Sequence, residues 1–442
     1  MASPEKVMEY VTTAFTDSSV QDRLACVSNL RVIALALGQE ATRKQLLPFL
    51  KELQEMSVGD EVLTSVAEVL GGFDDFVGGP EHAHHLLDPL LSLCTISETA
   101  VRTQAVDAIN TLGKKLSPVQ IFEYLAPKVF ELFEEKDFFR NVSACGLVAI
   151  AYTGCSQCTN YDDQCTVFAG DEREKSFKPA ELGKELVEIY KRITENTEPM
   201  VRRSAALALA ETAKAFGDEM DGEMALRFAL FIDDAEAESL RVIALKSAPT
   251  IFRTVSLIGT DCGDKYLSCA VAKSWRVRVA VAESLVEVAH SRKANAQDIQ
   301  KCQETFLMLL QDSEAEVRYA AAAHSAAAAS VLGAHFAADV LIGAMEDMVK
   351  DETSTKRAAL AGVLLEMAGP IGMQKTNEVF LQPQPQPPSE GEGGADGTTL
   401  LASLVNDFDT NLRLMVISKL MGLIDVLTIS QASEGTPCPP AN

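Results

Sequence analysis

The sequence predicts an all-α protein built from stacked helical repeats. Ala and Leu dominate its apolar residues, and only 6% of its residues are aromatic. Strands favour β-branched and aromatic residues, so this composition favours closely packed helices over a sheet. Apolar residues make up 47% of the 442 residues, which is enough to bury a large core. The third observation is a short signature that recurs along the chain.

The recurring signature consists of an acidic residue, a few polar residues and an apolar–basic pair that opens an apolar helical segment. Its clearest copies end at Arg102, Arg202, Arg241, Arg278, Arg318 and Arg413, and a degenerate copy ends at Arg357. From Arg202 to Arg357 the successive intervals are 39, 37, 40 and 39 residues. A period near 39 residues is typical of a HEAT or armadillo unit.

Each repeat is predicted to contain two helices. The first carries a Pro-marked apolar segment, as at 46–50 and 86–91, and the second follows the apolar–basic pair, as at 101–113 and 201–213. In the second helices apolar residues recur at i, i+3, i+4 and i+7, which is the spacing of one buried stripe. One unit cannot bury its stripe alone, so about ten units are expected to stack into a superhelical, horseshoe-like solenoid.

Four glycines stand at the predicted helix ends, where a left-handed cap is expected. They are Gly38, Gly71, Gly113 and Gly333. The basic residue of each signature is expected to pair with an acid of a neighbouring unit. This would form a ladder of ion pairs that sets the register between repeats.

Two intervals are longer than one period. The interval between Arg140 and Arg202 contains a polar, helix-poor segment at 153–176, which we interpret as an inserted loop. The later segment at 381–399 is poor in apolar residues and rich in Pro, Gly and Glu, so it is predicted to be a disordered insertion.

The predicted domain organisation is therefore a single HEAT-type solenoid over residues 1–431. An unstructured tail is expected at 432–442, because this segment has no helical pattern.

The charge balance is strongly acidic, with 39 basic and 63 acidic residues. Such a surface repels phosphate backbones and anionic lipid, so neither nucleic acid nor a membrane is an expected partner. The N-terminus lacks the apolar stretch of a signal peptide. The ten cysteines are scattered through helical patterns, as expected for reduced intracellular thiols. We expect a cytoplasmic protein, with the nucleus as a second location.

Metal and enzyme sites are not expected. Cys155, Cys158 and Cys165 form C-x2-C-x6-C without the fourth ligand that a structural zinc site needs, so free thiols are predicted. The H-x-H-H run that begins at His82 is likewise predicted to bind no metal. The glycine-rich segment at 78–82 lacks the strand–loop–helix context of a phosphate-binding loop. We predict no catalytic residues and no cofactor.

Seven segments carry a more specific likeness: IALALG (33–38), TRKQLLPFL (42–50), FVGGPE (76–81), SACGL (143–147), EPMVRRSAA (198–206), KSWRVR (273–278) and EAEVR (314–318). They closely resemble the scaffolding A-subunit family of protein phosphatase 2A, from about residue 10 to about residue 431. The resemblance implies a horseshoe of fifteen HEAT repeats. Its N-terminal intra-repeat turns would hold a regulatory B subunit, and its last five repeats would hold the catalytic subunit.

The resemblance also implies a set of protein-binding residues on the ridge of intra-repeat turns. They are Glu61, Glu98, Pro199, Arg202, Arg203, Ser274, Trp275 and Arg276. Arg and Trp are favoured at the energetic centres of interfaces. Core packing is the alternative for Trp275, and service in the inter-repeat ladder is the alternative for Arg202 and Arg276.

The sequence ends after about the tenth repeat, so the repeats that hold the catalytic subunit in the family are expected to be missing. Three hypotheses follow. The chain is a phosphatase scaffold, or a truncated decoy that binds regulatory subunits only, or a general adaptor of the HEAT or armadillo class. An importin-type receptor would need Trp and Asn arrays, and the chain has one Trp.

Overall fold

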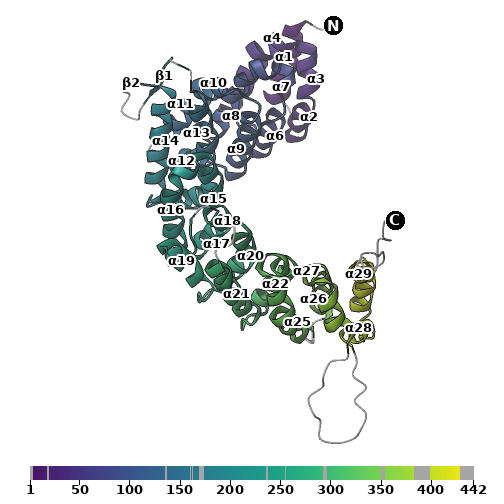
Figure 1. The fold of residues 1–442 in the computed structure, drawn as a ribbon. Helices are drawn as coiled ribbons and strands as arrows, with labels where there is room; N and C mark the ends of the chain where they lie inside the picture. The colour runs from purple at the N-terminus through teal and green to yellow at the C-terminus, as the bar shows by residue number, and fades with distance from the viewer. Residues whose placement is uncertain are drawn as a thin grey trace, which may run out of the picture. The chain divides into compact units, whose positions relative to one another are not determined.

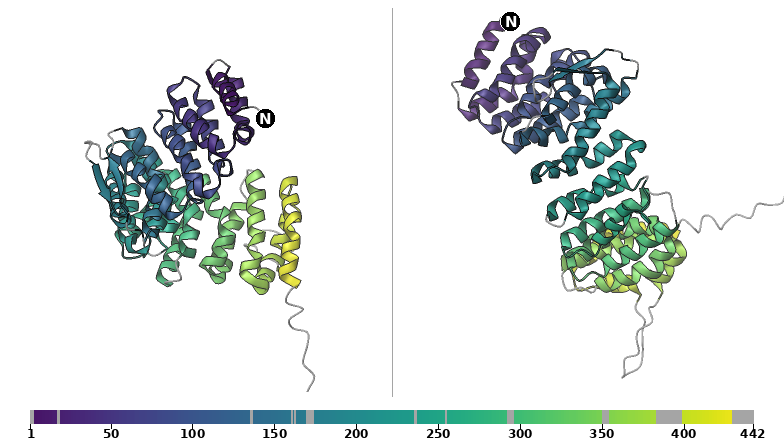
Figure 2. Two further views of the ribbon diagram at one scale, coloured as in Figure 1. Left: turned by 90° about the horizontal axis from the view of Figure 1, so that it is seen from above. Right: turned by 90° about the vertical axis from the view of Figure 1, so that its left-hand side faces the viewer.

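The computed structural model describes residues 3–16, 19–134, 137–159, 161, 163–168, 174–234, 237–253, 255–291, 296–349, 354–382 and 399–428. Nearly all of these lie in helices, and the described part contains one two-stranded sheet (Figure 1). The chain divides into two compact units, residues 1–227 and 228–442. Within each unit, helices follow one another in antiparallel pairs, as the sequence predicts for an all-α repeat solenoid (Figure 2).

The first unit contains the elements up to α15. They are α1 (Pro4–Thr16), α2 (Val20–Ser28), α3 (Leu30–Leu37), α4 (Gln39–Ala41), α5 (Leu47–Glu52), α6 (Asp60–Leu70), α7 (Asp74–Val77), α8 (Leu87–Leu93), α9 (Thr99–Gly113), α10 (Pro118–Gln120), α11 (Ala126–Glu134), α12 (Phe138–Cys145), α13 (Val148–Gln157), β1 (Cys165–Phe168), β2 (Glu174–Phe177), α14 (Pro179–Thr194) and α15 (Pro199–Phe216). Helix α16 (Asp221–Asp233) contains the boundary between the units.

The second unit continues to α29. Its elements are α17 (Glu238–Leu245), α18 (Ala248–Ile251), α19 (Asp261–Cys269), α20 (Trp275–Ser291), α21 (Ala296–Leu310), α22 (Ala315–Ala323), α23 (Ser325–Leu332), α24 (Ala334–Phe336), α25 (Ile342–Val349), α26 (Ser354–Glu366), α27 (Ala368–Thr376), α28 (Leu400–Val405) and α29 (Thr410–Thr428). None of the helices in the described ranges is long and apolar enough to cross a membrane.

The core of each unit lies between successive repeats. In the first unit α6 packs against α9 and α12 packs against α15, while in the second unit α20, α22, α26 and α29 pack in succession. The buried stripe has the predicted helical spacing: on α6, Val62, Val66 and Leu70 are fully buried. Stacking of these second helices buries an apolar face that a single helix pair would leave in water.

Two of the four glycines have the positive φ that favours glycine, but their ψ angles of 161° at Gly38 and 141° at Gly333 differ from those of a left-handed helical cap. Gly38 ends α3 with φ of 78°, and Gly333 ends α23 with φ of 110°. Gly71 follows α6 with φ of −59°, so it is not a left-handed cap. A Cβ at Gly71 would lie 3.1 Å from the Ala108 Cβ, and a Cβ at Gly113 would lie 2.7 Å from Ile150 Cγ1. At these two positions glycine serves close helix packing between repeats.

Several first helices contain a π-helical turn. These turns are Thr42–Leu46, Ile121–Leu125, Ala337–Leu341 and Asn377–Leu381. Short 3₁₀ turns at Leu53–Glu55, Pro80–Leu86 and Asp218–Met220 complete the helical segments. Thr42 and Thr376 stand at the same place in their repeats, and each hydroxyl donates to the carbonyl oxygen eight residues earlier, over 3.4 and 3.0 Å.

The described part of the inserted segment at 153–176 contains regular secondary structure, so it is not simply a loop. Its first residues complete α13, and a β-hairpin follows in which Cys165 pairs with Phe177 and Phe168 with Glu174. Strand β1 packs on α11, with the Phe177 ring 5.5 Å from the Phe130 ring. The hairpin thus covers the outside of a first helix. Residues 383–398 of the second insertion and the tail at 432–442 lie outside the described residues.

Candidate protein-binding ridge

The signature arginine closes the turn of its own repeat. In Arg102, Arg202, Arg278 and Arg318, Nη1 donates to the carbonyl oxygens of the sixth and fifth preceding residues, over 2.6 to 3.2 Å. Arg413 makes the first of these bonds, over 2.6 Å. Charge-assisted bonds to backbone carbonyls are strong, so each arginine fixes the chain that leads into its helix. The sequence did not predict this role. Every residue has a backbone carbonyl oxygen, so residue types do not reveal which carbonyl accepts the bond.

The predicted ladder between repeats is present at specific positions. Arg278 forms a two-pronged ion pair with Asp312 of the next repeat, over 2.7 and 2.9 Å. Arg357 of the degenerate copy contacts Asp407 through Nη2 alone, over 3.1 Å. Arg102 instead places its guanidinium 4.7 Å from the centre of the Phe139 ring. The contact with the next repeat therefore varies, while the turn-closing bonds recur.

In the first unit, the predicted ridge residues stand at the starts of α6, α9 and α15. Glu61 is exposed in the first turn of α6, and Glu98 caps α9 by accepting from the Ala100 amide over 3.4 Å. Pro199 is the first residue of α15, where its missing N–H costs nothing. Arg202 is half-buried because it closes the turn, whereas Arg203 is exposed one position further round the helix.

In the second unit, Ser274, Trp275 and Arg276 open α20 as one small cluster. Trp275 is half-buried, and the guanidinium of Arg276 lies 4.6 Å from the centre of its ring. Arg276 also lies 3.5 Å from Glu238, one repeat earlier. The hydroxyl of Ser274 is buried without a hydrogen-bond partner among the described residues. The cluster therefore offers an aromatic surface with a cation stacked on it.

The three cysteines of the insertion are buried thiols. Burial raises the pKa of Cys165 to about 11 and raises the pKa of Cys155 and Cys158 as well. Within the described ranges, no group of three potential ligands is arranged to hold a metal ion. These thiols pack where the hairpin and α13 meet, and their raised pKa values keep them protonated at neutral pH.

The histidine run lies on a helical surface. His84 stacks on Tyr124 with ring centres 4.3 Å apart, and the Gln120 side chain lies 3.3 Å from its Nδ1. Burial lowers the pKa of His84 and of His85. The His84 ring therefore packs against the neighbouring first helix, with the exposed His85 ring beside it, and both rings are neutral near neutral pH.

Comparison with known proteins places these features in a family context. The chain is 39% identical, over 197 residues, to the alpha isoform of the 65 kDa regulatory A subunit of serine/threonine-protein phosphatase 2A from Arabidopsis thaliana. It is 37% identical over 198 residues to the beta isoform from Homo sapiens. The chain resembles the 65 kDa regulatory A subunit of protein phosphatase 2A. Each of these alignments covers 45% of this chain and 29% of the relative.

Solved structures support the fold alone. The karyopherin Kap121p, bound to the extreme C-terminus of the protein phosphatase Cdc14p, superposes with a TM-score of 0.61 at 16% identity and covers 98% of this chain and 43% of its own. Kap95p in its complex with RanGDP gives a TM-score of 0.57 at 13% identity, covering 97% and 51%. No protein-family profile matches the sequence. The likeness to the A subunit therefore rests on the pairwise alignments and on the repeat fold.

Proposed function

We propose that the chain is a non-catalytic scaffold subunit of a serine/threonine phosphatase of the 2A type. In this proposal the ridge of intra-repeat turns holds a regulatory subunit of the B type, in the cytoplasm or the nucleus. The observation that carries it is the 36–39% identity to A subunits. Because the chain spans about three tenths of those relatives, its partners are inferred from the ridge as well as from the likeness.

The ridge supports this proposal because it contains two kinds of side chain, those that hold the turns and those that are exposed to a partner. In Arg202 and Arg278, Nη1 donates to two turn carbonyls, which makes the turns rigid supports. Arg203 and Arg276 stand exposed beside them, and Trp275 adds a half-buried ring. A rigid turn lowers the entropic cost of holding an exposed side chain against a partner.

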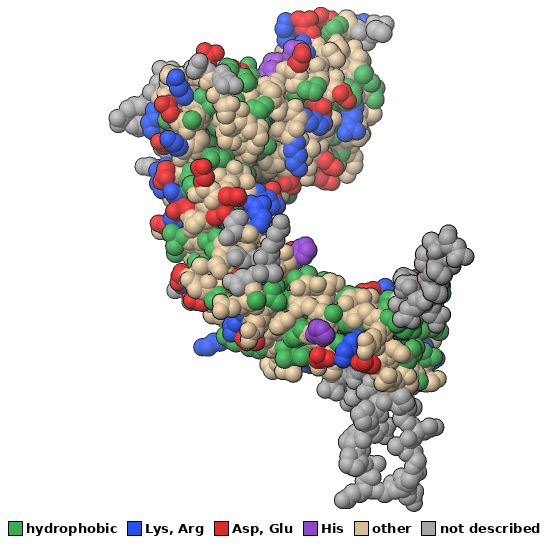
Figure 3. Space-filling model, in the orientation of Figure 1, with side chains coloured by type: hydrophobic (Ala, Val, Ile, Leu, Met, Phe, Trp, Pro, Cys, Tyr) green, Lys and Arg blue, Asp and Glu red, His purple; other side chains and the backbone are tan. Residues whose placement is uncertain are grey.

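The charge of the surface bears on the kind of partner. On the face drawn in Figure 3, acidic and basic side chains are interspersed, with apolar side chains between them. The net charge of −24 nevertheless favours partners with basic faces. Glu61 and Glu98 on the ridge would contact such faces.

The test uses purified regulatory B-type and catalytic subunits of protein phosphatase 2A and the full chain. Capture of the B-type subunit on immobilised chain is measured with the unchanged protein and with Arg203→Glu. The matched control is Lys44→Glu, a charge reversal at an exposed lysine on a first helix of the same unit. We expect Arg203→Glu to weaken capture about tenfold and Lys44→Glu to leave it unchanged. Equal capture by both variants would refute the ridge assignment.

The same experiment decides between scaffold and decoy. A ternary complex that holds the catalytic subunit in active form supports the scaffold. Capture of only the regulatory subunit supports a decoy that sequesters it. If neither subunit binds, the phosphatase proposal fails and a general HEAT adaptor remains.

A further inference from the structure

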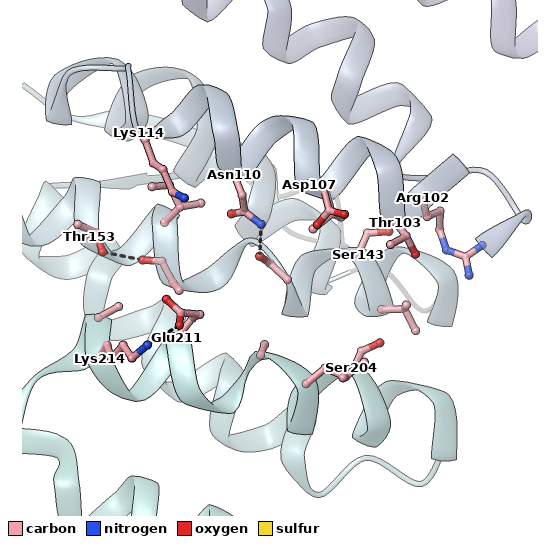
Figure 4. A pocket seen from close by; sticks show the side chains of 18 of the residues that line it. Arg102, Thr103, Asp107, Asn110, Lys114, Ser143, Thr153, Ser204, Glu211 and Lys214 are labelled. Atoms are coloured by element: carbon pink, nitrogen blue, oxygen red, sulfur yellow. Dashed lines mark hydrogen bonds and ion pairs between the residues drawn. The ribbon is translucent and has the colours of Figure 1, made fainter. Parts of the chain in front are cut away.

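A second surface, separate from the ridge, lies in the first unit. It is a groove of about 680 Å³ whose walls are α9 and α15 and whose floor is α12 and α13 (Figure 4). None of the eight predicted ridge residues lines it. It lies along the second helices, whereas the ridge lies at the turns before them.

The floor of the groove is a broken helix. Helix α12 ends at Cys145 and α13 begins at Val148, with Gly146 in the break. The Asn110 side-chain amide donates to the Gly146 carbonyl oxygen over 3.0 Å. A Cβ at Gly146 would lie 2.7 Å from Val106 Cγ1, so only glycine lets α9 approach the floor here. These contacts fix the position of α9 on the floor of the groove.

The middle of the groove is apolar. Val106, Ala149 and Ile150 are partly exposed along one wall and the floor, and Ala208 faces them from α15. Leu207, also on α15, is 61% exposed. A large apolar side chain with this exposure leaves most of its surface uncovered by the described part of its own unit. The area offers a partner a hydrophobic contact of the kind that stabilises an amphipathic helix in a groove.

One end of the groove carries two lysines and one glutamate. Lys114 follows the last residue of α9, and Lys214 lies in the last turn of α15, so the two ammonium groups stand on opposite walls at the same end (Figure 4). Both side chains are exposed, and Lys214 shares its charge with Glu211, 2.7 Å away. Asp107 and Glu211 are the acidic side chains of the lining. The two lysines outnumber Glu211 at this end, which leaves one net positive charge for a partner's carboxylates.

We propose that this groove binds one amphipathic helix of a partner protein, with carboxylates at its N-terminal end held between Lys114 and Lys214. The distance from Thr99 to Lys114 along α9 is about 22 Å, which accommodates about four helical turns. Acidic residues are favoured in the first turn of a helix, so the partner helix runs antiparallel to α9 and α15. Its apolar stripe lies on Leu207, Ile150 and Val106. This inference does not depend on the identity of the ridge partner.

The test uses two synthetic helical peptides of about 15 residues that share leucines at i, i+4, i+7 and i+11. One peptide carries three glutamates in its first turn, and the other carries three lysines there. Binding to the full chain is measured by fluorescence anisotropy. We expect the glutamate peptide to bind at least about tenfold more tightly than the lysine peptide.

Variants then locate the site. Leu207→Glu should abolish binding of the glutamate peptide, whereas Leu35→Glu, at a residue that is 72% exposed on α3, should leave it unchanged. The double variant Lys114→Glu/Lys214→Glu should reverse the preference and select the lysine peptide. Circular dichroism confirms folding of each variant, since all these side chains are exposed.

Each other outcome overturns the proposal. Failure of both peptides to bind excludes a helix groove. Equal losses from Leu207→Glu and Leu35→Glu show non-specific adsorption. If the double lysine variant still prefers the glutamate peptide, Lys114 and Lys214 do not determine which peptide binds. Competition of the glutamate peptide by acetate alone would indicate a simple anion site in place of a helix site.

Discussion

The same signature arginine makes different contacts in the two compact units. In the first unit Arg102 is 2% exposed and lies against the Phe139 ring of the next repeat. In the second unit the Arg278 side chain is 12% exposed and pairs with the carboxylate of Asp312. Both keep the two bonds to turn carbonyls.

The comparison separates an invariant role from a variable one. Closing the turn requires a guanidinium with several donors, which explains why arginine recurs in the signature. The contact with the next repeat needs only a group that can stabilise a buried positive charge. An aromatic ring serves at Arg102 and a carboxylate at Arg278, whereas Arg357 of the second unit lies against both the Asp407 carboxylate and the Phe408 ring. The effects of substitution should therefore differ in size and in their dependence on salt and pH.

The largest expected effect follows removal of Arg102. In Arg102→Ala two turn carbonyls lose their donor and the Thr99 hydroxyl loses a partner at 3.1 Å. We expect the free energy of unfolding to fall by about 3 kcal/mol, measured by urea denaturation of the full chain. Faster amide exchange should be confined to the turn before α9 and its neighbours. A loss below about 0.5 kcal/mol would show that this arginine does not hold the turn.

The next effect is the coupling between Arg278 and Asp312. A double-mutant cycle with Arg278→Ala and Asp312→Ala should give a coupling energy of about 1–3 kcal/mol. Added salt should reduce this coupling, whereas the loss in Arg102→Ala should be insensitive to salt. The matched cycle is Arg102→Ala with Phe139→Ala. If both cycles respond equally to salt, the distinction between the two units is wrong.

The pH dependence of the second unit sharpens the same point. Burial alone would raise the pKa of Asp312, but hydrogen bonds from Arg278 and the Glu314 amide outweigh it and lower the pKa below its ordinary value. A lowered folded pKa gives stability that is complete above the unfolded pKa, about 4, and is lost as the pH falls through the folded value. We expect the free energy of unfolding of the Arg278→Met variant to depend less steeply on pH below about pH 4 than that of the unchanged protein. An unchanged slope would assign the dependence to other carboxylates.

The smallest expected effect on stability concerns Arg276. Its side chain is 60% exposed, and its pair with Glu238 at 3.5 Å lies in solvent. Arg276→Ala should change the free energy of unfolding by less than about 0.5 kcal/mol. Capture of a regulatory subunit should nevertheless weaken, because the cation on the Trp275 ring is lost. Loss of stability above about 1 kcal/mol would favour the alternative role in the inter-repeat ladder.

Much of the helical fold could be predicted from spacing alone. Buried residues such as Val62, Val66 and Leu70 follow the predicted stripe, since apolar periodicity depends only on side-chain type. The hairpin was not predicted, because among its residues of described burial Cys165 and Val167 alone are buried apolar residues within a polar segment. Two alternating residues are too few to distinguish a strand from a loop.

The site could be predicted only in outline. The exposed position of Arg203 follows from its offset of one residue from Arg202. The turn-closing bonds of Arg202 end on carbonyl oxygens, which the sequence does not display. The groove depends on a helix break at Gly146 and on the distance between two walls. Neither leaves a repeated pattern that reading along the chain could detect.

The π-helical turns in the first helices bear on how the repeats have diverged in length. A π-turn holds one residue more than the α-helix around it. Loss of a single residue within Thr42–Leu46 or Ile121–Leu125 would restore regular α-helix on both sides. The apolar residues beyond the turn would keep their direction. Such turns let a repeat gain or lose one residue without changing how it packs against its neighbours. The intervals of 37 to 40 residues between signatures vary within a similarly narrow range.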